Sequence, residues 1–230
     1  MFIFSQSWLI FVGIPLIIAM WAQYRVTSAF SKYSRLRASS NLTGADTARE
    51  ILNAAQIHDV EVVRVDGFLG DHYDPTGKRL CLSSETYNTP SLAAVGIAAH
   101  ECGHAIQHAK AYAPLEMRMM VVPVTQIASN ILPLVFLGAF IFPFLGMTLI
   151  KIAVICYLIL TVFQLITLPV EFDASRRAKI ILQNMGIVQS GEEAAGVNRM
   201  LNAAALTYVA AFIASLGNLL WLLSITQRRN

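Results

Sequence analysis

Four long uncharged stretches alternate with two polar segments along the chain. The uncharged stretches are residues 2–24, 119–148, 152–170 and 202–224, and none contains Asp, Glu, Lys or Arg. A helix rises about 1.5 Å per residue, so each stretch is long enough to cross a hydrocarbon core of about 30 Å. The pattern predicts about four transmembrane helices, with Lys151 at the turn of a hairpin formed by the second and third.

The first stretch is expected to remain attached as a membrane anchor. No basic residue precedes it, and Met20 and Ala22 on either side of Trp21 do not form the small-x-small site at which signal peptides are cleaved. This stretch therefore belongs to the fold.

The first polar segment, residues 25–118, has the pattern of a small α+β region. Residues 43–57 have apolar positions at helical spacing behind Thr43, a good N-cap. Residues 60–83 show β-branched alternation interrupted by an Asp-Pro-Thr-Gly turn, which predicts a small hairpin sheet. Residues 91–110 are rich in small apolar side chains and predict a buried helix.

The second polar segment begins at Glu171 and leads into the last uncharged stretch. The chain is therefore expected to divide into an N-terminal transmembrane helix (1–24), a polar α+β region (25–118), a transmembrane hairpin (119–170), a polar helix (171–200) and a C-terminal transmembrane helix (201–226). The predicted fold class is a membrane protein, mainly α, with a small sheet.

Composition agrees with a membrane protein. Hydrophobic residues make up 56% of the chain and charged residues 13%, against about 45–50% and about 25% in soluble domains. The net charge of +3 is spread over the polar segments and gives no nucleic-acid-binding signature. Cys81, Cys102 and Cys156 have no CxxC spacing and are expected to be reduced thiols, which favours a location facing the cytoplasm.

Basic residues predict the orientation of the four spans. Segments 25–118 and 171–199 lie on the same side of the membrane and hold ten and four of the seventeen Lys and Arg residues. Lys151, Arg228 and Arg229 lie on the other side. The positive-inside rule then places both polar segments in the cytoplasm and both chain termini outside.

A five-residue motif, HECGH at 100–104, carries the candidate chemistry. A helix turns about 100° per residue, so His100 and His104 lie on one face, one turn apart, where two imidazoles can bind one zinc ion. Glu101 lies beside that face, where its carboxylate can take a proton from a water that zinc has acidified to a pKa of about 7. Chance is a poor explanation, because the chain has only five histidines and three ionisable groups would otherwise be buried among small apolar residues.

A catalytic zinc usually has three protein ligands and one open position. His108 lies two turns from His100, about 12 Å along the helix axis, and is expected to be a polar residue at the helix end. Glu171 is the better third ligand, because it is the first acidic residue after the hairpin and returns to the same side of the membrane. The alternative is an interfacial carboxylate paired with one of the arginines that follow it.

Two segments on either side of the hairpin, HECGHAIQH at 100–108 and PVEFDASRRA at 169–178, resemble the YugP-like neutral zinc metallopeptidases, a bacterial membrane family. TGADTAREIL, DHYDP, LCLS and NAAALTYVAA extend the resemblance over nearly the whole chain. It implies a gluzincin-type peptidase of the bacterial cytoplasmic membrane, with a zincin-like α+β catalytic region. It also implies that His100, His104 and Glu171 bind Zn²⁺ and that Glu101 is the base.

A looser likeness extends to the heat-shock-induced and prenyl-protein membrane peptidases, whose third-ligand motif reads Glu, three residues, Asp. Ser175 occupies that Asp position here. The Asp of the pattern orients a ligand histidine, so Ser175, Asp173 or another residue is left as the candidate for that role. Asp173 lies about 200° around a helix from Glu171, so the two cannot both face one ion.

Further residues are candidates for holding a substrate. In the zincin fold an edge strand beside the active helix pairs with an extended substrate, and the sequence favours residues 79–83 for this role, with an ordinary sheet strand as the alternative. His72, Tyr73 and Arg176 are candidates for donating a hydrogen bond to an oxyanion, with ordinary packing as the alternative.

The leading hypothesis is an enzyme that cleaves polypeptides, including unfolded or membrane-associated chains, while embedded in a lipid bilayer. A non-catalytic, zinc-stabilised membrane scaffold would keep the histidines but has no need of Glu101. A transporter would place ionisable residues inside the spans, and the spans contain no acidic residue and only Lys151 at their margin. The sequence gives no oligomeric state.

Overall fold

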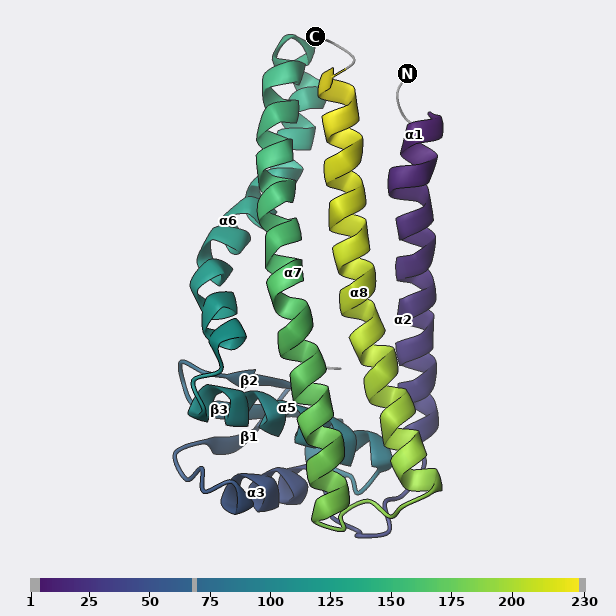
Figure 1. Cartoon of the computed structure of the whole chain (residues 1–230), viewed down its shortest axis with the longest axis vertical. Helices are drawn as coiled ribbons and strands as arrows, with labels where there is room; N and C mark the ends of the chain where they lie inside the picture. The colour runs from purple at the N-terminus through teal and green to yellow at the C-terminus, as the bar shows by residue number, and fades with distance from the viewer. Residues whose placement is uncertain (1–4, 68–69, 228–230) are drawn as a thin grey trace. The chain divides into compact units, whose positions relative to one another are not determined.

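The computed structural model describes residues 5–67 and 70–227, and it is mainly helical (Figure 1). Its elements are α1 (Gln6–Trp8), η1 (Leu9–Gly13), α2 (Ile14–Tyr33), α3 (Gly44–Ala54), β1 (Glu61–Val65), β2 (His72–Asp74), β3 (Arg79–Ser83), α4 (Ser84–Asn88), α5 (Leu92–Ala109), α6 (Ala113–Ile141), η2 (Pro143–Leu145), α7 (Gly146–Asn184) and α8 (Glu192–Gln227). The prediction of a mainly helical chain with one small sheet is confirmed.

The chain forms two compact units, each assembled from separate parts of the sequence. We call Met1–Gln23, Met117–Leu168 and Thr207–Asn230 the helical unit, and Tyr24–Glu116 and Pro169–Leu206 the polar unit. The HECGH motif and Glu171 both belong to the polar unit. The candidate site can therefore be described within one unit.

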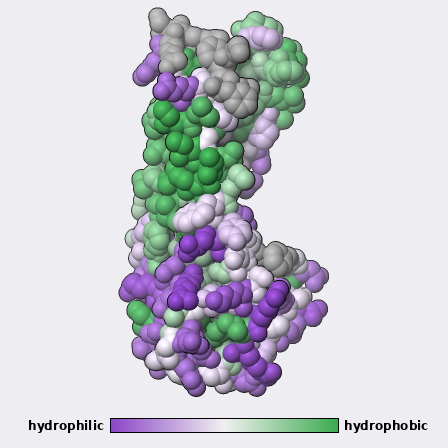
Figure 2. All heavy atoms as spheres, turned by 90° about the vertical axis from the view of Figure 1, so that its right-hand side faces the viewer, coloured by the Kyte–Doolittle hydropathy of each residue, from purple (hydrophilic) through white to green (hydrophobic). Residues whose placement is uncertain are grey.

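Four helices of the described residues are long and apolar enough to span a membrane: Gln6–Tyr33, Ala113–Ile141, Pro143–Asn184 and Glu192–Gln227. Large apolar side chains of the helical unit face outward, as Phe140 does with 84% of its surface exposed. Figure 2 shows hydrophobic residues gathered along these helices. Water disfavours such a surface, whereas lipid does not.

The turn of the predicted hairpin lies at Phe142–Leu145 and not at Lys151, which is inside α7. Phe142 leaves the helical conformation, with φ of −119° and ψ of 74°, and Pro143 begins η2, where the first turn needs no backbone N–H from proline. Pro123 and Pro133, in contrast, lie inside an unbroken α6. Arg228 and Arg229, which entered the predicted orientation, lie outside the described residues.

The polar segment 171–200 is not one helix. α7 runs without a break from its apolar part through Glu171 and ends at Asn184, and α8 begins only at Glu192. Gly186 and Gly191 lie in the turn between them with φ of +67° and +99°, a conformation that favours glycine. Glu171 therefore belongs to a helix that starts 25 residues earlier, at Gly146.

The sheet of the polar unit has the strand order β1-β3-β2. β2 and β3 form the predicted antiparallel hairpin, and β1 pairs with β3 in parallel. The prediction that residues 79–83 form a free edge is wrong, because both sides of β3 already carry a partner strand. The alternation of side-chain types in residues 61–65 predicted a strand, but it did not indicate with which strand β1 would pair.

α5 lies in the core of the polar unit. Its small side chains, among them Ala98, Ala99 and Ala105, are buried with apolar residues of α3, β3, α7 and α8. Thr43 begins α3 with a capping box that includes Asp46, which confirms the predicted N-cap. Ser91 caps α5, where its hydroxyl accepts a hydrogen bond from the backbone N–H of Ala94. The fold thus buries the helix that carries the motif on most of its faces.

Candidate metal centre

His100, His104 and Glu171 come together from α5 and α7. Their potential ligand atoms all lie within 4.8 Å of one another. Nε2 of His100 is 3.3 Å and Nε2 of His104 is 3.7 Å from Oε2 of Glu171. The two imidazole rings are edge to face with centroids 4.8 Å apart, as expected for residues one helical turn apart. The structure thus gathers the three predicted ligand residues in one place.

The donor set fits a zinc ion. Two imidazole nitrogens and one carboxylate oxygen form the His₂Glu set of catalytic zinc sites, which leaves one position open. Two atoms bound at about 2.0–2.1 Å to a tetrahedral ion are about 3.4 Å apart, close to the separations of the histidine nitrogens from Glu171. Glu171 is 2% exposed, so a bound cation would also balance a buried carboxylate charge.

Each histidine is held through its other ring nitrogen. Nδ1 of His100 is 3.1 Å from Oγ of Ser175, and Nδ1 of His104 is 3.0 Å from Oε1 of Gln107. Such contacts leave the Nε2 atoms facing the carboxylate and fix the ring orientation, as in known zinc sites. The role left open between Ser175 and Asp173 is therefore divided, because Ser175 contacts His100 and Asp173 contacts Gln107.

Gln107 was not among the site residues predicted from the sequence. It lies three residues after His104, on the same side of α5, and it is fully buried. The signal was an uncharged polar side chain in a helix otherwise predicted to be buried on most sides, but nothing in the sequence indicated its partners.

Glu101 is also buried, with 8% of its surface exposed. Burial lowers the pKa of His104, but the hydrogen bond with Glu171 and the negative charges of Glu101 and Glu171 outweigh it, so that the pKa lies above its ordinary value. The carboxylate of Glu101 is thus close enough to His104 to favour its charged form.

Cys102, in the middle of the motif, is not suited to chemistry. It is fully buried, its Sγ contacts the backbone carbonyl of Ala48, and burial raises the pKa of its thiol well above the ordinary value. Burial also raises the pKa of Cys81. Nucleophilic and metal-binding cysteines need the thiolate form, so the motif offers its histidines and its glutamate only.

The remaining predicted residues have other contacts. The hydroxyl of Tyr73 is 2.9 Å from Nδ1 of His108, and burial raises the pKa of Tyr73 to about 12. His72 is exposed and its Nδ1 contacts the carbonyl of Gly70. Arg176 pairs with Asp173. A role of His72, Tyr73 or Arg176 in stabilising an oxyanion stays a prediction.

Gly103 lets α5 and α7 approach closely beside the candidate ligands. A Cβ atom at position 103 would lie 2.7 Å from the carbonyl oxygen and 3.0 Å from the Cα atom of Ala174. Real side chains do not approach backbone atoms this closely, so only glycine fits here. Gly103 immediately precedes His104, and Ala174 lies three residues after Glu171, so this approach brings the ligands together.

Gly103→Ala is expected to weaken both the fold and the metal centre, because the added methyl group would push α5 away from α7. Overpacking of this kind costs about 1–3 kcal/mol in the free energy of unfolding. Thermal unfolding in detergent and zinc titration measure the two effects. Gly146→Ala is the control, since nothing lies within 4 Å of a Cβ at that helical glycine. An unchanged unfolding temperature and zinc affinity for Gly103→Ala would contradict the prediction.

Comparison with known families matches residues 8–227 to a family described as "Putative neutral zinc metallopeptidase". The chain belongs to this family. A curated relative from Bacillus subtilis (strain 168), described as "Putative membrane protease YugP", is 47% identical over 203 residues, which cover 88% of this chain and 89% of the relative. No solved structure gives a significant match.

Membership of the neutral zinc metallopeptidase family agrees with the geometry. The family name specifies zinc, and His100, His104 and Glu171 form a group that can hold a metal ion. A peptidase acts on polypeptides, so the substrate class also follows from the family. The four apolar helices agree with a relative named as a membrane protease.

Proposed function

We propose that the chain is a membrane-embedded, zinc-dependent endopeptidase of the gluzincin type, in which His100, His104 and Glu171 bind the metal. The observation that carries the proposal is the convergence of two Nε2 atoms and one carboxylate oxygen within 4.8 Å. Three side chains with this chemistry, drawn from two helices and largely shielded from water, match a catalytic zinc site.

Glu101 is the proposed general base. Zinc, when bound, supplies a Lewis acid that polarises the substrate carbonyl and lowers the pKa of water to about 7. Glu101 follows His100 directly on α5, so its carboxylate lies beside the ligand nitrogens rather than between them. From there it can accept the proton of the attacking water and pass it to the leaving amine nitrogen.

The proposed location is the bacterial cytoplasmic membrane, with the candidate site facing the cytoplasm. The polar unit holds most of the basic residues, and the four apolar helices can cross a bilayer. Substrates would then be cytoplasmic or membrane-associated polypeptides, and an unfolded chain would enter most readily.

Removal of the metal is expected to abolish peptide hydrolysis by the purified protein in detergent. The assay follows cleavage of casein, an unfolded protein, before and after treatment with a chelator, and again after zinc is restored. A chelator already saturated with zinc is the control for effects of the chelator itself. Undiminished cleavage by protein that metal analysis shows to be free of zinc would overturn the proposal.

Single cysteines at Glu50 and Gln183 are expected to resist an impermeant thiol reagent in intact cells and to react after lysis. Both positions are exposed in the polar unit, for which we propose a cytoplasmic location from the distribution of basic residues. Phe144→Cys, in the turn between α6 and α7, is expected to react in intact cells. The unmodified chain measures background labelling, because its three cysteines are buried. The reverse pattern would place the candidate site outside.

A further inference from the structure

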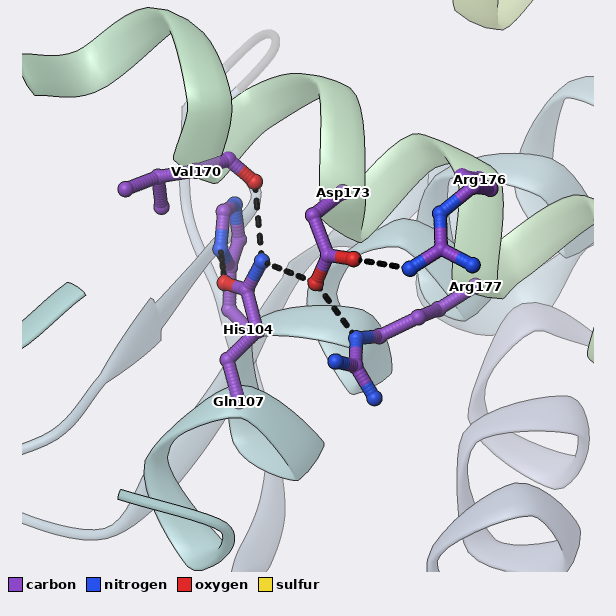
Figure 3. A network of polar contacts seen from close by, with 6 residues as sticks. All are labelled: His104, Gln107, Val170, Asp173, Arg176 and Arg177. Carbon is purple, nitrogen blue, oxygen red and sulfur yellow. Dashed lines mark hydrogen bonds and ion pairs between the residues drawn. The ribbon is translucent and has the colours of Figure 1, made fainter. Parts of the chain in front are cut away.

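A continuous network of polar contacts leads from the surface of the polar unit to His104 (Figure 3). Arg176 and Arg177 both contact the carboxylate of Asp173. Nε2 of Gln107 donates to Oδ2 of Asp173 at 2.9 Å, and Oε1 of the same amide lies 3.0 Å from Nδ1 of His104. Gln107 is the link between the ion pairs and the candidate metal ligand.

The surroundings of Gln107 leave its amide one orientation. Its Nε2 donates to the backbone carbonyl of Val170 at 2.9 Å as well as to Asp173. Both partners can only accept, since neither a carbonyl nor a carboxylate carries a hydrogen. A flipped amide would place its oxygen against these two acceptors and leave the polar groups of a fully buried side chain without hydrogen-bond partners, which is unfavourable.

The orientation of the amide determines which nitrogen of His104 carries hydrogen. Because Oε1 of Gln107 is an acceptor, Nδ1 of His104 must donate to it. The neutral imidazole then has its lone pair on Nε2, the atom that faces Glu171. His100 lacks this constraint, because the hydroxyl of Ser175 can either donate or accept.

The same amide also holds the helix turn that presents Glu171. Val170 and Asp173, which accept its two hydrogen bonds, lie on α7 directly before and two residues after Glu171. Asp173 in turn is fixed by charge-assisted contacts, one of them from Nε of Arg177 at 2.5 Å. Gln107 thus connects α5 to α7 at the point where their ligands meet.

We propose that Gln107 is a positioning residue that presets His104 as an Nε2 ligand, and that Asp173, held by Arg176 and Arg177, acts on the metal centre through Gln107. The inference rests on the proposed function, because it takes zinc to bind at His100, His104 and Glu171. Loss of a partner of a metal ligand typically lowers metal affinity by about 10–100-fold. An effect of this size can be measured without an activity assay.

The test is a double-mutant cycle on zinc affinity, measured by competition with a chelator in detergent. Gln107→Met keeps the length of the side chain but removes both functions of the amide, and it is expected to lower zinc affinity by about 10–100-fold. Asp173→Ala is expected to lower affinity as well, by less than His104→Ala does. The double variant is expected to match Gln107→Met alone, because Asp173 acts through the amide.

Ser175→Ala provides the matched comparison, since Ser175 contacts the other histidine. In the double variant, the fold-changes in zinc affinity caused by Ser175→Ala and by Gln107→Met are expected to multiply, as for independent sites. If Gln107 had only a structural role, Gln107→Met would lower the unfolding temperature of the zinc-free protein. The cycle with Asp173→Ala and the cycle with Ser175→Ala would then give the same result. Equal multiplication in both cycles, or an unchanged zinc affinity in folded Gln107→Met, would overturn the inference.

A third cycle covers the case in which Gln107→Met does not fold. Arg177→Met alters the outer end of the network, where the side chain is 21% exposed. It is expected to lower zinc affinity in the wild-type background and to have no further effect once Asp173→Ala is present; independent effects would overturn the inference. If His104→Ala binds zinc like the wild type, the proposed function itself fails, which is a different outcome.

Discussion

Glu101→Gln is expected to lower the rate of peptide hydrolysis by roughly 10²–10⁴-fold while zinc stays bound. The amide has nearly the shape of the carboxylate but cannot accept the proton of the attacking water. Glu101 is not among the three candidate ligands, so the metal site should remain intact. Casein cleavage measures the rate, and metal analysis of the same sample measures the zinc content.

Glu50→Gln is the matched control, because it makes the same chemical change at an exposed position of the polar unit. It should cleave at the wild-type rate. Undiminished cleavage by Glu101→Gln would rule out Glu101 as the base. If Glu101→Gln loses its zinc along with its activity, the residue holds the metal site together and the assignment of a base is no longer supported.

Glu171→Gln is expected to lower zinc affinity by more than the roughly 10–100-fold that follows from losing a ligand's hydrogen-bond partner. The substitution keeps the size of a buried side chain and removes the negative charge that faces both histidines. Competition with a chelator gives the affinity, and thermal unfolding of the zinc-free protein tests whether the fold is preserved.

His108→Ala is the control for the third ligand. His108 is the next histidine on α5, but the structure pairs it with Tyr73 and not with the candidate metal centre. It should keep the zinc affinity of the wild type. Loss of zinc in His108→Ala together with full affinity in Glu171→Gln would show that the third ligand is wrongly assigned.

Local patterns in the sequence predicted those parts of the fold that depend on neighbouring residues. The cap at Thr43 and the spacing of His100 and His104 are properties of a single helix, so they could be predicted without knowledge of the partners. Glu171 could be predicted as a ligand because the order of the apolar stretches returns it to the same side of the membrane as the HECGH motif. The family resemblance pointed to the same residue.

Features that depend on distant partners could not be predicted. The partners of Gln107 on α7 lie 63 and 66 residues away in sequence. The fit of Gly103 against Ala174 likewise depends on how two helices pack. β1 pairs in parallel with β3 and not with β2, which follows it in the sequence. The alternation of side chains along a strand does not indicate its partner strand.

With both sides of β3 occupied, an extended polypeptide that joins this sheet must do so along the outer side of β1 or β2. β2, which also contacts α5, is only three residues long. Neighbouring residues of a strand direct their backbone groups to opposite sides, so about one or two residues of β2 can bond to an added chain. So few hydrogen bonds would bind the backbone of an added chain weakly and would give little sequence selectivity. An unfolded chain would be the easiest to accommodate there, because it has no folded contacts to give up before it extends, although ordering its backbone still costs conformational entropy.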